Sequence, residues 1–317
     1  MAAPAPLLAP RTVSRAGVRR IGACHAPGAR HREHGVGAGL ATLTAMTQAT
    51  IAFIGGGNMA QALIGGLLRA GRPAASIVVV DPSPPQRERL AQAFGLRPQA
   101  TADARLAQAA TVVWAVKPQF FAAAAAPSAP YVGGALQLSV MAGIRSEAVA
   151  RASGSERVVR AMPNTPALIG RGIAGLYARD AVDAAGRAEA EALFAPTGQT
   201  LWVTQERDLD AVTALSGSGP AYVFYFVEAM MQAAAEMGLT PAQGRQLALA
   251  TFDGATALAA ASSEAPETLR AQVTSKGGTT HAAVTVLDDA GVKAAFVKAL
   301  HAARERARAL GDEFGVA

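Results

Sequence analysis

Short apolar runs alternate with amphipathic segments along residues 51–140. Four runs rich in Val, Ile, Leu and Ala predict strands at 51–54, 76–80, 111–116 and 135–140. The segments between them predict helices near 57–70, 84–94 and 119–126. Strands that are apolar throughout and alternate with helices are typical of a parallel sheet covered on both faces. Further elements are expected after residue 150, with strands at 157–162, 173–178 and 200–203 and a helix at 182–194.

After Glu206 the pattern becomes helical, with glycine and proline as punctuation and no good strand candidate. Helices are expected at 206–215, 220–237, 241–262, 266–273, 280–290 and 292–310. The helix at 220–237 is apolar almost all round in its first half, which is typical of a bundle interior or an oligomer interface. The fold class is therefore α/β plus all-α: a Rossmann-type dinucleotide-binding domain at 49–205 and a helical domain at 206–317.

Composition changes this picture mainly for the first 48 residues. A chain of 317 residues that is 51% hydrophobic can bury a substantial core. The net charge of +6 comes largely from residues 1–48, which hold six arginines and a single acid, Glu33. The rest of the chain is close to neutral and shows no basic patch for nucleic acid. We expect residues 1–48 to be a disordered tail and translation to start at Met46.

The same counts bear on compartment and membrane association. The single cysteine, Cys24, lies in the tail, so one chain cannot form an internal disulfide, as is typical of a reducing compartment. The most apolar window, 221–231, is interrupted by Glu228 and is too short to cross a bilayer. No His, Cys and acidic cluster has metal-ligand spacing. We expect a cytoplasmic protein without a membrane segment or a metal.

A glycine-rich turn follows the first strand directly. Ile54 leads into Gly55-Gly56-Gly57-Asn58-Met59-Ala60, which fits G-x-G-x-x-A between a strand and a helix. Gly55 permits the tight turn, Gly57 lets the backbone approach a pyrophosphate, and Ala60 lets the helix pack on the strand. The helix N-terminus then offers N–H groups to the phosphates. These residues predict a site for NADPH or NADH, with an ordinary turn as the alternative.

Asp81 ends the second strand, where an acidic side chain contacts the adenosine ribose in such domains. A carboxylate there accepts hydrogen bonds from a 2′-hydroxyl and repels a 2′-phosphate. Asp81 also begins an Asp-Pro-Ser-Pro-Pro segment, which is strong turn chemistry. Both interpretations stay open. Because Ser83 or Arg87 could offset the repulsion, we expect both cofactors to be used.

Five further segments make the chain recognisable. They are Ala115-Val116-Lys117-Pro118, Met141-Ala142-Gly143, Arg160-Ala161-Met162-Pro163-Asn164-Thr165-Pro166, Leu215-Ser216-Gly217-Ser218-Gly219-Pro220-Ala221-Tyr222 and Val273-Thr274-Ser275-Lys276-Gly277-Gly278-Thr279-Thr280. With the glycine turn they resemble the pyrroline-5-carboxylate reductase family over essentially all of residues 49–311. One departure is Lys276, where many members have proline, and the tail has no counterpart.

The resemblance implies reduction of 1-pyrroline-5-carboxylate to L-proline by NADPH or NADH, the final step of proline biosynthesis. It implies a Rossmann domain followed by a helical domain for substrate binding and dimerisation. The active site is then expected between the N-terminal domain of one subunit and the C-terminal helices of another. Such homodimers often assemble further into decamers.

The last motif carries the expected substrate site. Gly277 and Gly278 precede the helix expected from 280, and a glycine pair there makes a nest of N–H groups suited to a carboxylate. The resemblance gives Thr280 the catalytic role of offering its hydroxyl to the substrate nitrogen, whereas an ordinary helix cap is the alternative. The other expected substrate-binding residues are Ser275, Thr279 and Ser218. The remaining expected cofactor-binding residues are Ala115, Val116, Lys117, Pro118 and Asn164.

Two other functions compete with this one. A β-hydroxyacid dehydrogenase-like reductase would share only the Rossmann half and would be expected to place a lysine base on its long interdomain helix. The helices expected at 220–237 and 241–262 contain no lysine. A nucleotide-sensing scaffold would keep the glycine turn but would have no need of the segment at 275–280.

Overall fold

The structure is a computed structural model that describes residues 49–314. Within these residues, seven strands form one sheet in the order β2-β1-β3-β4-β5-β6-β7. The strands are β1 (Thr50–Ile54), β2 (Ile77–Val80), β3 (Ala109–Trp114), β4 (Leu136–Ser139), β5 (Val158–Met162), β6 (Gly172–Ala178) and β7 (Gly198–Trp202). Each lies where an apolar run predicts it. The expectations for Met46 and the tail fall outside the described residues.

The sheet is parallel except at one pair, β5 and β6. A short link that contains only a 3₁₀ turn, Thr165–Ile169, joins these two strands. Because a parallel neighbour needs a crossover of a dozen or more residues, this link can only return the chain antiparallel. From β6 to β7 the chain crosses over through a helix, α6 (Ala184–Phe194), and the pairing is parallel again.

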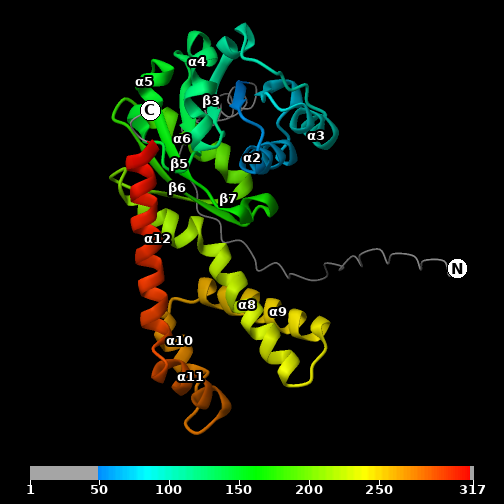
Figure 1. The fold of residues 1–317 in the computed structure, drawn as a ribbon, viewed down its shortest axis with the longest axis vertical. Coiled ribbons are helices and arrows are strands. Elements are labelled where there is room, and N and C mark those ends of the chain that lie inside the picture. The colour runs from blue at the N-terminus through cyan, green and yellow to red at the C-terminus, as the bar shows by residue number, and fades with distance from the viewer. Residues whose placement is uncertain (1–48, 315–317) are drawn as a thin grey trace, which may run out of the picture. The chain divides into compact units, whose positions relative to one another are not determined.

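Helices cover both faces of the sheet, as the apolar strands predict (Figure 1). One apolar cluster packs α2 (Asn58–Arg69), α3 (Pro84–Phe94) and α6 on the sheet through side chains that include Leu63, Leu90 and Phe194. The other packs α4 (Phe121–Val132) and α5 (Ser146–Ser153) around the fully buried Trp114. With both faces filled, the strand ends and their loops remain for binding.

The chain from residue 208 onward is helical. The helices are α7 (Asp208–Val212), α8 (Gly219–Glu236), α9 (Pro241–Ala261), α10 (Pro266–Gln272), α11 (Thr279–Asp289) and α12 (Val292–Phe314). The helix expected at 206–215 is a short α-helix that continues into a π-helical turn, Thr213–Gly217. No helix in the described part of the chain is long and apolar enough to cross a membrane.

Helix α12 contacts both halves of the chain. Phe296 in its first half packs edge-on against Tyr222 and Phe226 of α8, with ring centroids 5.6 and 5.7 Å apart. Near its other end, the backbone of Leu310 lies against Gly143, where a Cβ would be 3.0 Å from the Leu310 carbonyl oxygen. This end of α12 therefore packs on the turn between β4 and α5 (Figure 1).

The helical half leaves much of its apolar surface exposed. On α8, the side chains of Val223, Phe224 and Tyr225 are 43%, 58% and 70% exposed, and Leu258 on α9 is 61% exposed. Large apolar side chains exposed in this number on two packed helices are typical of an interaction site. Residues 49–314 therefore do not cover the apolar side chains of α8, which fits the oligomer interface that the sequence predicts for this helix.

Candidate functional site

The glycine turn lies at the carboxyl end of β1, between the neighbouring strands β2 and β3. Gly55 has φ +96°, and a Cβ there would meet the Ala115 carbonyl oxygen at 2.7 Å. Its N–H donates to Val80 O at 2.8 Å, and Ala115 N–H donates to Ile54 O at 2.8 Å. Only glycine satisfies both the backbone conformation and the close approach. The structure therefore brings the first glycine and the predicted Ala115-Val116 segment into direct contact.

Gly56 and Gly57 differ in what surrounds them. A Cβ on Gly56 would lie 2.5 Å from Leu90 Cδ1, whereas a Cβ on Gly57 would meet no atom closer than Ala115 O at 4.0 Å. Gly57 is the exposed N-cap of α2, and no acidic residue lies in the first turn of that helix. Asn58 and Met59 follow at the open helix end, and Ala60 is fully buried against the sheet. An open glycine before unpaired helix N–H groups fits the pyrophosphate of a dinucleotide.

Asp81 is 9% exposed, and both of its carboxylate oxygens are engaged by backbone. Oδ2 accepts from Gly56 N–H at 2.9 Å, and Oδ1 accepts from Ser83 N–H at 2.9 Å. Arg87 donates from Nη1 to the carbonyl oxygens of Asp81 and Pro82 at 2.9 and 2.8 Å. The Asp81 carboxylate thus anchors both the glycine turn and the turn after β2. The Arg87 guanidinium lies beside the second of these turns.

The neighbouring positions complete this edge of the sheet. Lys117 is exposed and precedes a short 3₁₀ helix, Pro118–Phe120, while Ser83 is exposed on the turn after β2. Gln86 is not among the residues predicted from the sequence, yet its side-chain amide donates to Gly56 O. The sequence gives no signal for this role of Gln86, because the hydrogen bond depends on how α3 packs beside the glycine turn.

Asn164 follows β5 and ties the sheet to the helical half. Its Oδ1 accepts from Ile173 N–H at 3.0 Å, and its Nδ2 donates to Ser216 O at 3.2 Å. Asn164 also lines a cleft of about 570 Å³, together with Pro220, Tyr222 and other residues of α8 and α12. Ser218, the N-cap of α8, belongs to the same stretch of chain as this cleft.

The segment at 275–280 joins α10 to α11 and is largely exposed. Gly277 has φ +76°, and Gly278 donates from its N–H to Ser275 O at 3.0 Å. Helix α11 begins at Thr279 with Gly278 as its N-cap and no side-chain cap. The interpretation of Thr280 as a helix cap is therefore wrong. Its hydroxyl has no hydrogen-bond partner within residues 49–314.

The predicted site is not assembled within one chain. The glycine turn and Ala115-Val116 meet at the sheet edge, whereas α10 and α11 lie at the end of α12 that is remote from the sheet (Figure 1). Ser275, Thr279 and Thr280 are exposed there. The predicted cofactor site and the predicted substrate loop are therefore separated in one chain. This separation fits an active site that is completed by a second subunit.

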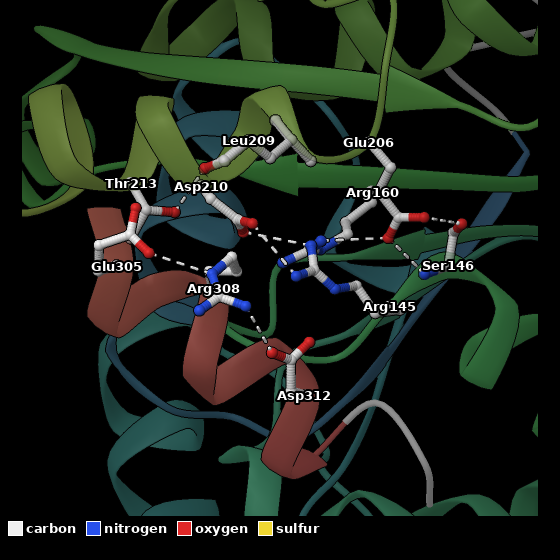
Figure 2. Close-up of polar contacts among 10 residues, drawn as sticks. All are labelled: Arg145, Ser146, Arg160, Glu206, Leu209, Asp210, Thr213, Glu305, Arg308 and Asp312. Carbon is white, nitrogen blue, oxygen red and sulfur yellow. Dashed lines mark hydrogen bonds and ion pairs between the residues drawn. The ribbon is translucent and has the colours of Figure 1, made fainter. Parts of the chain in front are cut away.

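A buried cluster of ion pairs connects the sheet to the helical half (Figure 2). Arg160 on β5 pairs with Glu206 at 3.1 Å, and Arg145 pairs with Asp210 of α7 at 3.2 Å. The Arg160 side chain is 4% exposed. Burial lowers the pKa of its guanidinium from the usual value, and the Glu206 carboxylate acts in the opposite direction. This cluster was not predicted from the sequence.

The fold and the glycine edge define a two-domain NAD(P)H-dependent oxidoreductase. The family model described as pyrroline-5-carboxylate reductase dimerisation matches residues 206–310, and the one described as NADP oxidoreductase, coenzyme F420-dependent, matches residues 50–143. The pyrroline-5-carboxylate reductase of Pseudomonas aeruginosa is 42% identical over 272 residues, which cover 85% of this chain and 100% of the relative. That of Haemophilus influenzae is 40% identical with the same coverage. The chain belongs to the pyrroline-5-carboxylate reductase family.

Solved structures agree with this assignment. A pyrroline-5-carboxylate reductase from Coxiella burnetii has a TM-score of 0.76 at 35% identity and covers 83% of this chain and 98% of its own. The Plasmodium falciparum enzyme, solved with NADP bound, has a TM-score of 0.76 at 27% identity and covers 84% and 99%. The β-hydroxyacid dehydrogenase-like alternative is not favoured. The helical half is thus the family's dimerisation domain, and the chain oligomerises.

Proposed function

We propose that this protein reduces 1-pyrroline-5-carboxylate to L-proline with NADPH or NADH, the final step of proline biosynthesis. The observation that carries the proposal is the glycine cradle of Gly55 and Gly57 in a chain of the pyrroline-5-carboxylate reductase family. The bound nicotinamide supplies a hydride to the imine carbon of the substrate. The protein's own tasks are to position the two reactants and to stabilise the charges around the imine.

The cofactor is proposed to lie along the edge formed by the ends of β1, β2 and β3. The N–H groups of Gly57, Asn58 and Met59 would hold the pyrophosphate, since this helix end is open and carries no acidic side chain. Asp81 and Ser83 border the adenosine ribose, and Arg87 supports a 2′-phosphate through its position beside that turn. The nicotinamide half is assigned to Ala115, Val116, Lys117 and Pro118.

The substrate is proposed to bind the loop at 275–280 of a partner subunit. Gly277 and Gly278 would present backbone N–H groups to its carboxylate, with Ser275 and Thr279 beside them. The Thr280 hydroxyl has no partner within the described residues, so it is available to the imine nitrogen. Ser218 and Asn164 are assigned to the edge of the cleft, where Asn164 supports the site through Ser216.

A coupled spectrophotometric assay tests the function. Full-length protein at micromolar concentration should oxidise NADPH or NADH only after 1-pyrroline-5-carboxylate is added, and proline should appear in equal amount. No turnover with either cofactor would contradict the proposal. We further propose that the dimers assemble into decamers, which mass photometry of the same sample would reveal. Cytoplasmic localisation stays a prediction.

A further inference from the structure

Two arginines and two carboxylates form a buried joint between the Rossmann half and the helical half. We infer that Glu206 in this joint is a positioning residue: it holds the Rossmann half, which carries the cofactor edge, in a set orientation on the helical half. The inference rests on the proposed function, because orientation matters to catalysis only if cofactor and substrate bind to different halves. We define the joint as Arg145, Ser146, Arg160, Glu206 and Asp210.

Glu206 accepts three hydrogen bonds through its carboxylate, more than any other side chain of the joint makes. Its Oε1 accepts from Ser146 N–H at 2.7 Å and from Arg160 Nη1 at 3.1 Å, and its Oε2 accepts from the Ser146 hydroxyl at 2.6 Å. Ser146 is the first residue of α5, so the carboxylate also faces the positive end of that helix. One side chain at the start of the helical half thus binds both a strand and a helix of the Rossmann half.

A second layer lies beside Glu206. Arg145 donates from Nη1 and Nη2 to the two oxygens of Asp210, each at 3.2 Å. Gly311 of α12 lies against the same guanidinium, because a Cβ there would be 2.3 Å from Arg145 Nη2. Figure 2 shows Arg145 and Arg160 lying together between Asp210 and Glu206. The end of α12 is thereby brought into the joint.

The joint differs from the ion pairs on the surface of α12. Arg308 pairs with Glu305 and Asp312, but these side chains are between 52% and 65% exposed. Exposed pairs of this kind add little to stability. In the joint, two positive and two negative groups are largely buried, and no buried side-chain polar atom of the described chain lacks a partner. Such a network favours one relative placement of its members, because a shift would leave the buried Arg160 or Asp210 without its partner.

This geometry has a consequence for catalysis. When the helical halves of two subunits pair into a common core, each Rossmann half is held to that core through its joint. A looser joint lets the cofactor edge move relative to the substrate loop, and hydride transfer is sensitive to displacements of about 1 Å. The cofactor edge itself is built from β1, β2, β3, α2 and α3 and contains no member of the joint.

The test compares full-length Glu206→Ala with a matched control, Glu147→Ala. Glu147 lies in the first turn of the same helix, α5, but pairs with Arg151 on the surface, where the two side chains are 69% and 52% exposed. For Glu206→Ala we expect kcat/KM for 1-pyrroline-5-carboxylate to fall by about tenfold or more. The dissociation constant of NADPH, measured by its fluorescence, should stay unchanged. Glu147→Ala should match the wild type in both.

A second variant guards against simple misfolding. Glu206→Ala leaves Arg160 buried without its partner, so the double variant Arg160→Met/Glu206→Ala removes that unpaired charge. We expect the double variant to regain much of the lost Tm while kcat/KM stays low. Recovery of kcat/KM along with Tm would overturn the positioning role, and so would an equal loss of NADPH affinity. A wild-type protein that fails to reduce 1-pyrroline-5-carboxylate would instead overturn the proposed function, and this inference with it.

Discussion

Two glycines of the same turn should respond to alanine in opposite ways. Gly55→Ala places a side chain on a residue with φ +96° and sets its Cβ 2.7 Å from Ala115 O and 2.8 Å from Val116 Cγ1. Gly57→Ala keeps an ordinary backbone, φ −64° and ψ −173°, with the nearest atom 4.0 Å away. The first change should damage the fold, and the second should damage cofactor binding.

The magnitudes follow from these contacts. The left-handed conformation costs an alanine about 1–2 kcal/mol, and an overpacked contact adds about 1–3 kcal/mol. Gly55→Ala should therefore destabilise the protein by roughly 2–5 kcal/mol and lower Tm by several degrees. Gly57→Ala should change stability by about 1 kcal/mol at most, because the restricted unfolded chain favours alanine by about 0.4–1 kcal/mol while the N-cap position favours glycine. Its methyl group would lie where the pyrophosphate approaches, so KM for NADPH should rise about tenfold, or about 1.4 kcal/mol.

Thermal unfolding and cofactor titration of both variants separate these effects. The assays should use one protein concentration throughout, since the stability of an oligomer depends on it. A Gly57→Ala enzyme with wild-type KM for both NADPH and NADH would refute the placement of the pyrophosphate at this turn. A Gly55→Ala protein with wild-type Tm would refute the reasoning from the close approach to Ala115.

Three further predictions concern other parts of the molecule. Thr280→Val should lower kcat/KM for 1-pyrroline-5-carboxylate by about ten- to 150-fold, the value of one hydrogen bond to a charged partner. Its Tm should not change, because Thr280 caps no helix; an enzyme with wild-type kinetics would remove Thr280 from the site. Asp81→Ser should raise the NADPH/NADH ratio of kcat/KM and also lower stability by about 1–3 kcal/mol, since Gly56 and Ser83 lose their acceptor. An unchanged ratio measured with both cofactors would leave Asp81 as a turn anchor alone. Sedimentation at micromolar concentration should show a dimer or a larger assembly, because Phe224 and Tyr225 are exposed in one chain; a well-behaved monomer would contradict this.

Local pattern was enough to predict the strands, most of the helices and the glycine turn, although helix α5 was not predicted. Strands β1 to β6 lie where largely apolar runs occur, because a strand covered on both faces must be mostly apolar. The edge strand β7 is the exception: it is half exposed, and its sequence is only partly apolar. The turn from Gly55 to Ala60 could also be predicted from local sequence. Its backbone geometry is a property of neighbouring residues, and the positive φ of Gly55 confirms the role that the spacing predicts. The motifs after residue 206 predicted the family that the comparisons show.

Tertiary structure decided the partners of Asp81 and Asn164 and the joint around Glu206. Each depends on contacts between residues distant in sequence: Gly56 and Asp81 are 25 positions apart, Asn164 and Ser216 are 52, and Ser146 and Glu206 are 60. The sequence pattern does not predict such pairs, because the same carboxylate or amide residue occurs both on solvated surfaces and in buried networks. The helix boundary at Thr279 is different, because it follows a local turn in which Gly278 N–H donates to Ser275 O. Sequence determines which elements form, whereas packing determines which polar groups meet, since burial makes each unpaired group costly and leaves one arrangement.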